Sequence, residues 1–430
     1  MHEEAFVDGE IASRLQIVTK AIIQNVRNVR SIFLTGGFGK GEGSVEVKQE
    51  RETRFFRDFD IAVIVDSAPQ RDSLKKLYDQ IYRSLGLPNP ENSLFRFSSF
   101  VVDIRFLKNH DLIYPDIWFY DLKVASKLLW GEDIRGSIRT DKMSIPLSSG
   151  LRVLFEKVCG LLGNFSYGNL KPDCVQEEEE ESLIFECYKT FIEICTALCI
   201  ISRNYDSKYV YRAKNLQNIY RTEFPDLAQV LPDLPETVTK CTDFKLRPDF
   251  DRIHEDPVKL WFDARDTLET ILCWYLEKYS GLSSTDWDSS QDQIRAISKS
   301  YYKPFLNSLI RKRLRSSNEI ILDVSSLLFQ ALVNIEYSYV VTRHFSKAYI
   351  HPLRDPSIAP SLKFFLAGAM ILFSLNKDGT IEKRLLEKAI SQLRCCIPIK
   401  VSTLDGVGWD ITRKHFLKAY GLYRGYHFVK

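Results

Sequence analysis

Two aspartates, Asp58 and Asp60, stand near the start of the run RDFDIAVIVD at 57–66. On a β-strand, residues two positions apart leave the same face, so the two carboxylates are expected side by side, with Phe59 and Ile61 facing a core. Paired carboxylates repel each other unless a cation lies between them. An oxygen-only pair suits Mg²⁺, which takes its other ligands from water and from the phosphates of a substrate. The pattern therefore indicates a metal site for phosphoryl-type chemistry.

A third carboxylate, Asp103, lies in the apolar run SSFVVDIRFL at 98–107. Its neighbours Val102 and Ile104 are apolar, so the alternation of a strand puts Asp103 opposite the packing face. A third acid beside the first two would complete a two-metal site for phosphoryl-type transfer.

A glycine-rich turn provides the other half of the pattern. Five glycines fall within the eight residues 36–43, directly after the short apolar run SIFLT. Glycine allows the backbone N–H groups to approach a ligand closely, and the start of a helix favours anions. Gly36 and Gly37 are therefore predicted to cradle a triphosphate.

Together, LTGGFGKGEGS and RDFDIAVIV resemble the signature of the DNA polymerase β-like nucleotidyltransferase superfamily, over roughly residues 15–135. The step Lys-Gly-Glu at 40–42 resembles small bacterial members that modify aminoglycosides or other small acceptors. The resemblance implies that Gly36 and Gly37 hold the phosphates of the nucleotide. It also implies that Asp58 and Asp60 ligate two Mg²⁺ ions, and that Asp103, in VVDIRF, ligates one metal and helps to deprotonate the acceptor hydroxyl.

The sequence departs from that signature in two ways: residues 45–56 lengthen the spacer, and Gly37 stands where many members have serine. Three lysines are candidates for contacts with the triphosphate. Lys40 lies in the turn, and Lys123 and Lys127 lie in LKVASKLLWG, which we predict to be a helix that Asp121 caps and Gly131 ends. A solvated pair of lysines on a helix face is the alternative for the last two.

Helical and extended patterns alternate over roughly the first 110 residues. We predict helices at 10–30 and 67–86, strands at 31–35, 57–66 and 98–107, and a hairpin at 45–48 and 53–56. From about residue 148 the patterns are helical. The expected fold class is α+β: a nucleotidyltransferase-type mixed sheet with flanking helices, followed by a large helical region. The expected domains are 1–140, 141–285 and 286–430, with the last boundary in the Ser-, Gly- and Asp-rich run 280–292.

Composition limits the partners. The 430 residues carry 59 Lys and Arg against 56 Asp and Glu, a net charge of +3, which gives no global attraction for duplex nucleic acid or an anionic membrane. The dense basic cluster at 311–315 (Arg311, Lys312, Arg313, Arg315) is interpreted as a solvated helix end rather than an RNA-binding patch.

The apolar runs 321–341 and 361–375 are predicted as buried helices. The N-terminal residues show no pattern of a leader sequence, and the spacing of the nine cysteines shows no disulfide framework. We therefore predict a cytoplasmic protein without membrane contact.

The sequence thus predicts a Mg²⁺-dependent nucleotidyltransferase. It would move a nucleoside monophosphate from an NTP, such as ATP, to an acceptor hydroxyl of a small molecule and release pyrophosphate. Two alternatives stay open: transfer to a macromolecule such as a tRNA or a protein, and a catalytically degenerate fold that serves as a nucleotide-binding or interaction module.

Overall fold

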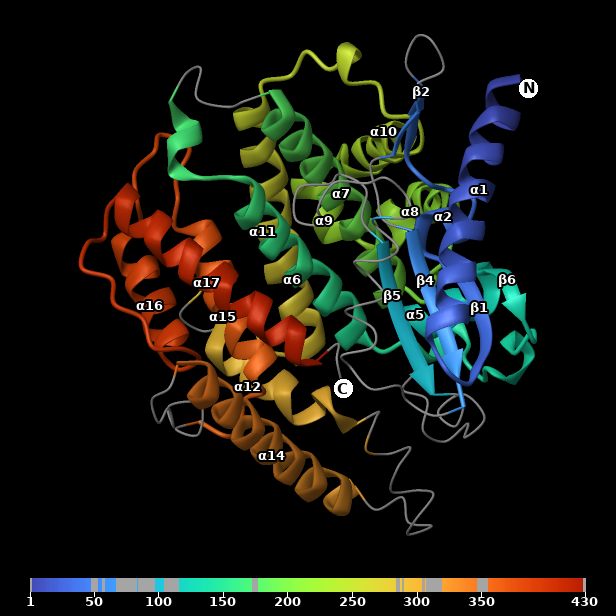
Figure 1. The fold of residues 1–430 in the computed structure, drawn as a ribbon. Coiled ribbons are helices and arrows are strands. Elements are labelled where there is room, and N and C mark those ends of the chain that lie inside the picture. Colours follow the sequence, from blue (N-terminus) through green and yellow to red (C-terminus); the bar gives the residue numbers. More distant parts are fainter. Residues whose placement is uncertain are drawn as a thin grey trace. The chain divides into compact units, whose positions relative to one another are not determined.

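Two compact units make up the chain in this computed structural model (Figure 1). Unit 1 comprises Met1–Ile145, Asn204–Lys214 and Thr242–Arg252, and unit 2 comprises Pro146–Arg203, Asn215–Cys241 and Ile253–Lys430. The structure describes residues 2–47, 53–55, 59–66, 83, 97–103, 116–171, 177–283, 287, 290–303, 306, 319–345 and 355–427.

Unit 1 is built on a four-stranded sheet in the order β5-β4-β1-β6. Its strands are β1 (Val29–Thr35), β4 (Phe59–Val65), β5 (Phe97–Asp103) and β6 (Lys127–Gly131). β1 is antiparallel to both β4 and β6, whereas β4 and β5 are parallel. The prediction of a mixed sheet in an α+β chain is confirmed.

Both faces of this sheet are covered by apolar side chains. Helix α1 (His2–Asn25) packs Leu15, Val18 and Ile22 against one face, where Ile61 and Val63 of β4 lie. On the other face, Ala62 and Ile64 of β4 contact Leu122 of α5 (Ile117–Ala125). The alternation along β4 therefore puts Asp60 on the α5 face.

A glycine turn and a small hairpin connect β1 to β4. The turn forms the one-turn helix α2 (Gly36–Gly39) directly after β1. The hairpin pairs β2 (Val45–Val47) with β3 (Thr53–Phe55), as the sequence predicts. The predicted helix at 67–86 and residues 104–107 lie outside the described residues, apart from Arg83.

The helix predicted after Asp121 is wrong in both its start and its end. Helix α5 begins at Ile117 with Asp116 in the N-cap position, so Asp121 lies inside it. Residues 127–131 form strand β6 instead of helix and pair with β1. The free edge of β1 offers a full row of backbone hydrogen bonds, and this tertiary pairing outweighs a weak local preference in Lys-Leu-Leu-Trp-Gly.

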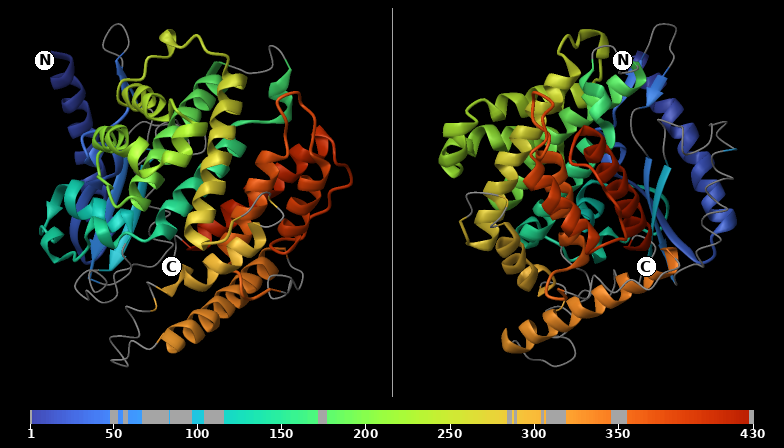
Figure 2. Two further views of the ribbon diagram at one scale, coloured as in Figure 1. Left: turned by 180° about the vertical axis from the view of Figure 1, so that it is seen from behind. Right: turned by 90° about the vertical axis from the view of Figure 1, so that its left-hand side faces the viewer.

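Helices dominate the rest of the chain, as predicted (Figures 1 and 2). They are α6 (Leu147–Asn164), α7 (Glu177–Ile201), α8 (Tyr209–Glu223), α9 (Pro225–Val230), α10 (Leu234–Leu246), α11 (Pro257–Ser280), α12 (Ser290–Tyr301), α14 (Glu319–Phe345), α15 (Pro360–Phe373), α16 (Lys383–Arg394) and α17 (Gly406–His427). Short 3₁₀ turns lie at Arg135–Ser137, Lys142–Ser144, Tyr167–Leu170 and Phe250–Arg252.

Aromatic stacking and one buried helix form the core of unit 2. Phe165 stacks on Trp261 with ring centroids 3.9 Å apart, and Phe155 stacks on Phe365 at 4.6 Å. All residues of α15 are buried, which confirms the prediction for 361–375. Helices α11, α12 and α15 pack together, so the two helical domains predicted on either side of residue 285 form one unit.

The prediction for the other apolar run is only half right. Residues 321–341 do form a helix, α14, but many of its apolar side chains are exposed. Among the described residues, Ile320–Phe345 is the one helix long and apolar enough to cross a membrane, and only 22% of its most apolar window is buried.

Candidate functional site

The glycine turn lies directly against Asp60. Thr35, the last residue of β1, is paired with Asp60 of β4, and its hydroxyl donates to the Asp60 carbonyl at 3.0 Å. The next residue, Gly36, has a φ of 61°, and a Cβ there would lie well under 3.0 Å from the Asp60 carboxylate oxygen Oδ2. Only glycine fits this backbone conformation and this close approach. The structure therefore brings the predicted turn and the predicted carboxylate together, whereas Asp58 lies outside the described residues.

Aromatic packing fixes the turn at this place. Phe38 of the turn stacks on Phe59, the residue before Asp60, with ring centroids 4.4 Å apart. Phe55 of the hairpin packs against both rings, at 6.1 Å from Phe38 and 5.7 Å from Phe59. The hairpin thus packs beside the turn through Phe55 and stabilises the position of the turn against the first residues of β4.

Lys40 is buried in an ion pair. Its ammonium lies 2.5 Å from Asp121 Oδ2, with only 6% and 13% of the two side chains exposed. Tyr205 donates its hydroxyl to the same carboxylate at 3.0 Å. Burial alone would lower the pKa of Lys40, but the charges of Asp121 and of the ionisable phenol of Tyr209 outweigh it and raise that pKa. Lys40 is thus committed to Asp121, which differs from the predicted contact with phosphate.

Glu42 ties the turn to the start of helix α8. Its carboxylate accepts the backbone N–H groups of Tyr209 at 2.7 Å and Val210 at 3.2 Å. A carboxylate at a helix N-terminus accepts hydrogen bonds from backbone N–H groups that have no partner within the helix, and it interacts favourably with the positive end of the helix dipole. The Lys-Gly-Glu step therefore has a structural role: its lysine and its glutamate both anchor the turn within unit 1.

Three cationic side chains gather around the ring of Tyr209 next to the turn. Arg212 lies 4.3 Å from the ring centroid, Lys245 lies 4.5 Å from it and Lys40 lies 5.2 Å from it. Lys245 also donates to the backbone carbonyl of Glu42, and its ammonium would lie 3.4 Å from a Cβ on Gly37. The sequence does not indicate Arg212 and Lys245, because both lie far from the turn along the chain.

The register of β5 keeps Asp103 away from Asp60. Asp60 is level with Ser98, and Asp103 is level with Val65. The two aspartates are thus five residues apart along parallel strands, or about 16 Å at ~3.3 Å per residue. This differs from the expected cluster of three acids. Among the residues that the structure describes, no three His, Cys, Asp or Glu side chains form a group that could hold a metal ion.

Two other acids, Asp66 and Asp116, could be considered as a third carboxylate beside Asp60, but their positions do not suit this role. Asp66 lies beyond the far end of β4, where it is exposed and pairs with Arg30 at 2.8 Å. Asp116 is buried at the N-cap position of α5.

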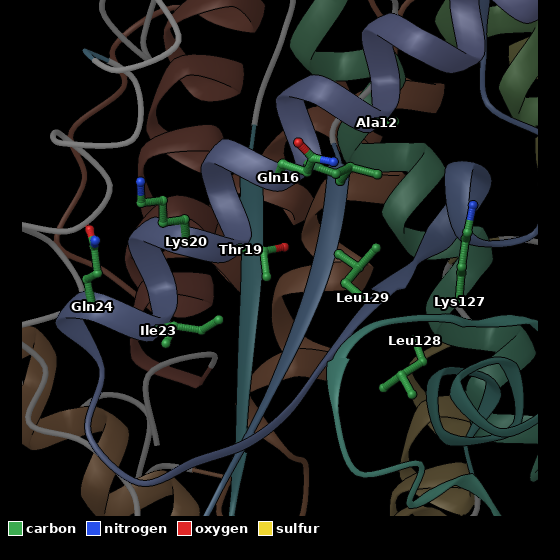
Figure 3. A pocket seen from close by; sticks show the side chains of 10 residues that line it. Ala12, Gln16, Thr19, Lys20, Ile23, Gln24, Lys127, Leu128 and Leu129 are labelled. Carbon is green, nitrogen blue, oxygen red and sulfur yellow. The ribbon is translucent and has the colours of Figure 1, made fainter.

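The two remaining lysines do not reach the turn. Lys123 lies on α5, as predicted, and donates to the carbonyl oxygen of Thr140 at 3.0 Å. Lys127 lies on β6 opposite Leu34, on the α1 face of the sheet. There it lines a pocket of about 490 Å³ between α1 and β6, together with Gln16 and Lys20 (Figure 3). This pocket is separated by the sheet from the Asp60 face.

Comparison with known proteins gives no information about the function of this chain. No protein-family model matches the chain, and no curated protein matches its sequence. A functional proposal therefore depends on the geometry of the turn and of the carboxylate beside it.

Proposed function

We propose that unit 1 binds a nucleoside triphosphate and transfers its nucleoside monophosphate to an acceptor hydroxyl in a Mg²⁺-dependent reaction. The observation that supports this most is the approach of Gly36 to the Asp60 carboxylate at the end of β1. A phosphate chain on the turn and a metal ion on that carboxylate would be neighbours in this arrangement, as transfer at the α-phosphate requires.

The donor chemistry fits a magnesium ion. Asp60 supplies hard carboxylate oxygens, and its side chain is only partly buried, so solvent and substrate oxygens can complete a coordination shell. Asp58, two residues earlier on the chain, is the proposed second ligand. When bound, the metal would stabilise charge on the attacking and leaving oxygens. The residues of this chain would hold the nucleotide: the turn would bind its phosphates through backbone N–H groups.

Lys245 and Arg212 are the proposed cations for the triphosphate, in place of Lys40, Lys123 and Lys127. Lys245 is buried beside Gly37, and Arg212 is buried 4.3 Å from the centroid of the Tyr209 ring. Fixed positive charges at a phosphate site stabilise a transition state without having to reorganise. We keep a small molecule as the proposed acceptor, because the near-balanced net charge of +3 favours no polyanion.

The register of β5 favours one second candidate: a nucleotide-binding module without transfer. If Asp103 stays about 16 Å along the sheet from Asp60, no third acid from β5 is available to accept the proton of an acceptor hydroxyl. The turn and Asp60 would then bind Mg·NTP and would not turn it over.

Pyrophosphate release from Mg·NTP tests the proposal. Asp60→Asn removes charge but keeps size, so turnover should fall by about two orders of magnitude or more while the fold persists. Asp66→Asn is the matched control, because it changes an exposed acid just beyond the same strand, and it should turn over like the wild type. Equal activity of the Asp60 variant and the wild type would rule out the metal role of Asp60.

Turnover by the wild type separates the two candidates, and Asp103→Asn tests whether Asp103 takes part in the chemical step. A loss of turnover with intact binding of Mg·NTP, measured by calorimetry, would assign Asp103 to the chemical step. Normal turnover would exclude Asp103 from it. Binding of Mg·NTP by the wild type without any pyrophosphate release, across a range of small and macromolecular acceptors, would favour the binding module.

A further inference from the structure

Helix α14 of unit 2 buries a stripe of polar residues and exposes a stripe of large apolar ones, although Val333, Tyr337 and Val341 are also buried on it. Ser326, Gln330, Asn334 and Ser338 follow one another at intervals of four residues, and all four are buried. A helix on the surface of a protein in water normally has the opposite arrangement, with its apolar stripe toward the core.

The inward polar stripe is held by hydrogen bonds to the body of unit 2. Gln330 donates to the carbonyl oxygen of Ser298 on α12 at 2.5 Å. Asn334 donates to the carbonyl oxygen of Ile358 at 3.0 Å and accepts from Lys363 of α15 at 3.1 Å. Figures 1 and 2 show α14, in orange, running alongside α12 at the edge of unit 2. These bonds fix which face of α14 points outward.

The outward face is a continuous apolar stripe. Leu328 is 62% exposed and Leu332 is 61% exposed. The large apolar residues that α14 exposes are Ile320, Val324, Leu327, Leu328, Leu332, Ile335 and Tyr339. From Ile320 to Tyr339 the stripe is about 28 Å long at ~1.5 Å per residue. The largest apolar patch on a protein surface, at a few hundred Å², is often a functional surface.

The area and the neighbouring charge distinguish between occupants. A stripe about 28 Å long and ~10 Å wide offers about 300 Å², whereas a stable protein interface needs about 800 Å² from each partner. A second copy on this face alone is therefore disfavoured. In the sequence, Arg311, Lys312, Arg313 and Arg315 precede α14, outside the described residues, and Arg343 is exposed in its last turn. The exposed acid of α14, Asp323, is paired with Lys303. Basic residues next to an apolar helix face are typical of attachment to anionic lipid.

We propose that α14 lies flat on an anionic membrane surface, with Leu328, Leu332 and their neighbours inserted at the boundary between headgroups and acyl chains. The helix does not cross the bilayer, because its polar side remains bonded to α12 and α15. This differs from the prediction of a protein without membrane contact, which was based on composition. A net charge near zero for the whole chain does not exclude a local combination of an apolar stripe and basic residues beside it in the sequence.

Cosedimentation of the full chain with vesicles tests the proposal. We expect binding to vesicles of phosphatidylcholine mixed with phosphatidylserine, weaker binding to phosphatidylcholine alone, and release by high salt. The double variant Leu328→Gln and Leu332→Gln should bind the mixed vesicles about tenfold less or weaker still, because two exposed apolar side chains no longer enter the lipid. Both residues are exposed, so the fold should be retained.

The matched control is Val230→Gln with Val407→Gln. These two valines are also highly exposed on helices of unit 2, but away from α14, and their variant should bind like the wild type. No binding of the wild type to the mixed vesicles, or equal binding by the α14 variant, would overturn the proposal. It would also be overturned if sedimentation velocity without lipid showed a dimer that the α14 substitutions dissociate, since a second copy would then cover this face.

Discussion

Each unit buries a lysine–carboxylate pair, and each places a carboxylate over a glycine, yet the surroundings differ. In unit 2, Lys157 of α6 lies 2.6 Å from Glu186 of α7, and Gly160 leaves room for that same carboxylate. In unit 1, Lys40 is paired with Asp121, whereas the carboxylate over Gly36 belongs to a different residue, Asp60. Unit 2 thus encloses one pair between two helices, and unit 1 separates the pair from the partly exposed acid.

The comparison distinguishes buried charges with a structural role from charges that gather at a candidate site. Glu186 is buried, and its position is explained by its lysine. Around the turn of unit 1, Lys40, Arg212 and Lys245 converge on the ring of Tyr209, next to an acid that solvent still reaches. Such a concentration of charge in one place is costly for folding, and proteins tolerate it mainly at functional sites.

The largest expected effect comes from breaking each ion pair. Lys40→Met and Lys157→Met should each lower the free energy of unfolding by about 3 to 5 kcal/mol, because each leaves a buried carboxylate without its lysine. Hydrogen exchange followed peptide by peptide should assign the first loss to unit 1 and the second to unit 2. Under conditions where both variants stay folded, only Lys40→Met should impair nucleotide turnover.

The exposed pair of Arg30 and Asp66 calibrates that result. Arg30→Met should cost less than about 1 kcal/mol, since both side chains are nearly half exposed. A comparable loss for Arg30→Met and Lys40→Met would contradict the importance of burial at Lys40.

Alkaline pH should act next most strongly, through a phenol of unit 2. Burial raises the pKa of Tyr220 from 10.0 to about 12. The unfolded chain therefore loses this proton first, so the free energy of unfolding should be unaffected below pH 10 and should fall between about pH 10 and 12. At ~1.36 kcal/mol per unit the contribution is at most about 2 to 3 kcal/mol, and solvent near the phenol screens part of it. Tyr220→Phe should flatten this part of a urea-denaturation series against pH, and an unchanged slope would refute the assignment.

Two glycine substitutions, which should cost less stability than breaking a buried ion pair, give the sharpest contrast in function. Gly36→Ala and Gly160→Ala each push a methyl group against a carboxylate, Asp60 and Glu186 respectively, at a cost of about 1 to 3 kcal/mol. Only Gly36→Ala should reduce pyrophosphate release, because only Asp60 is proposed to hold metal. Gly41→Ala is the control for backbone strain: its φ is 73°, but a Cβ there has open space. Equal turnover of the Gly36 and Gly41 variants would argue against the site.

The local parts of unit 1 are predictable from sequence, and the partners of the turn are not. β1, β4 and the hairpin follow from short apolar runs and glycine-rich turns, which encode their structure within a few residues. β6 was missed because the edge of β1 determines its conformation. Likewise, tertiary structure alone brings Lys245 to the turn and brings Tyr205 and Arg212 to its partners Asp121 and Tyr209, so no spacing in the sequence reveals them.

Helix α14 shows a different reason for failure. Its apolar composition correctly predicts a helix, and burial was inferred from that composition. The polar residues at intervals of four, from Ser326 to Ser338, mark one face of the helix, but by the usual rule that face would point to water, and only its hydrogen bonds to Ser298, Ile358 and Lys363 turn it inward. Composition gives the amount of apolar surface, whereas the tertiary hydrogen bonds of the polar residues decide which face of α14 packs.

The central claim is that Asp60 and the glycine turn form one metal and nucleotide site. Crystals grown with Mn²⁺ in place of Mg²⁺ and a non-hydrolysable NTP analogue test it most directly, because anomalous scattering locates the metal. The account predicts an anomalous peak within coordination distance of the Asp60 carboxylate, at about 2.0 to 2.3 Å, and a triphosphate on the backbone of Gly36 and Gly37. A bound nucleotide whose phosphates and metal lie away from Asp60 and from this turn would contradict it.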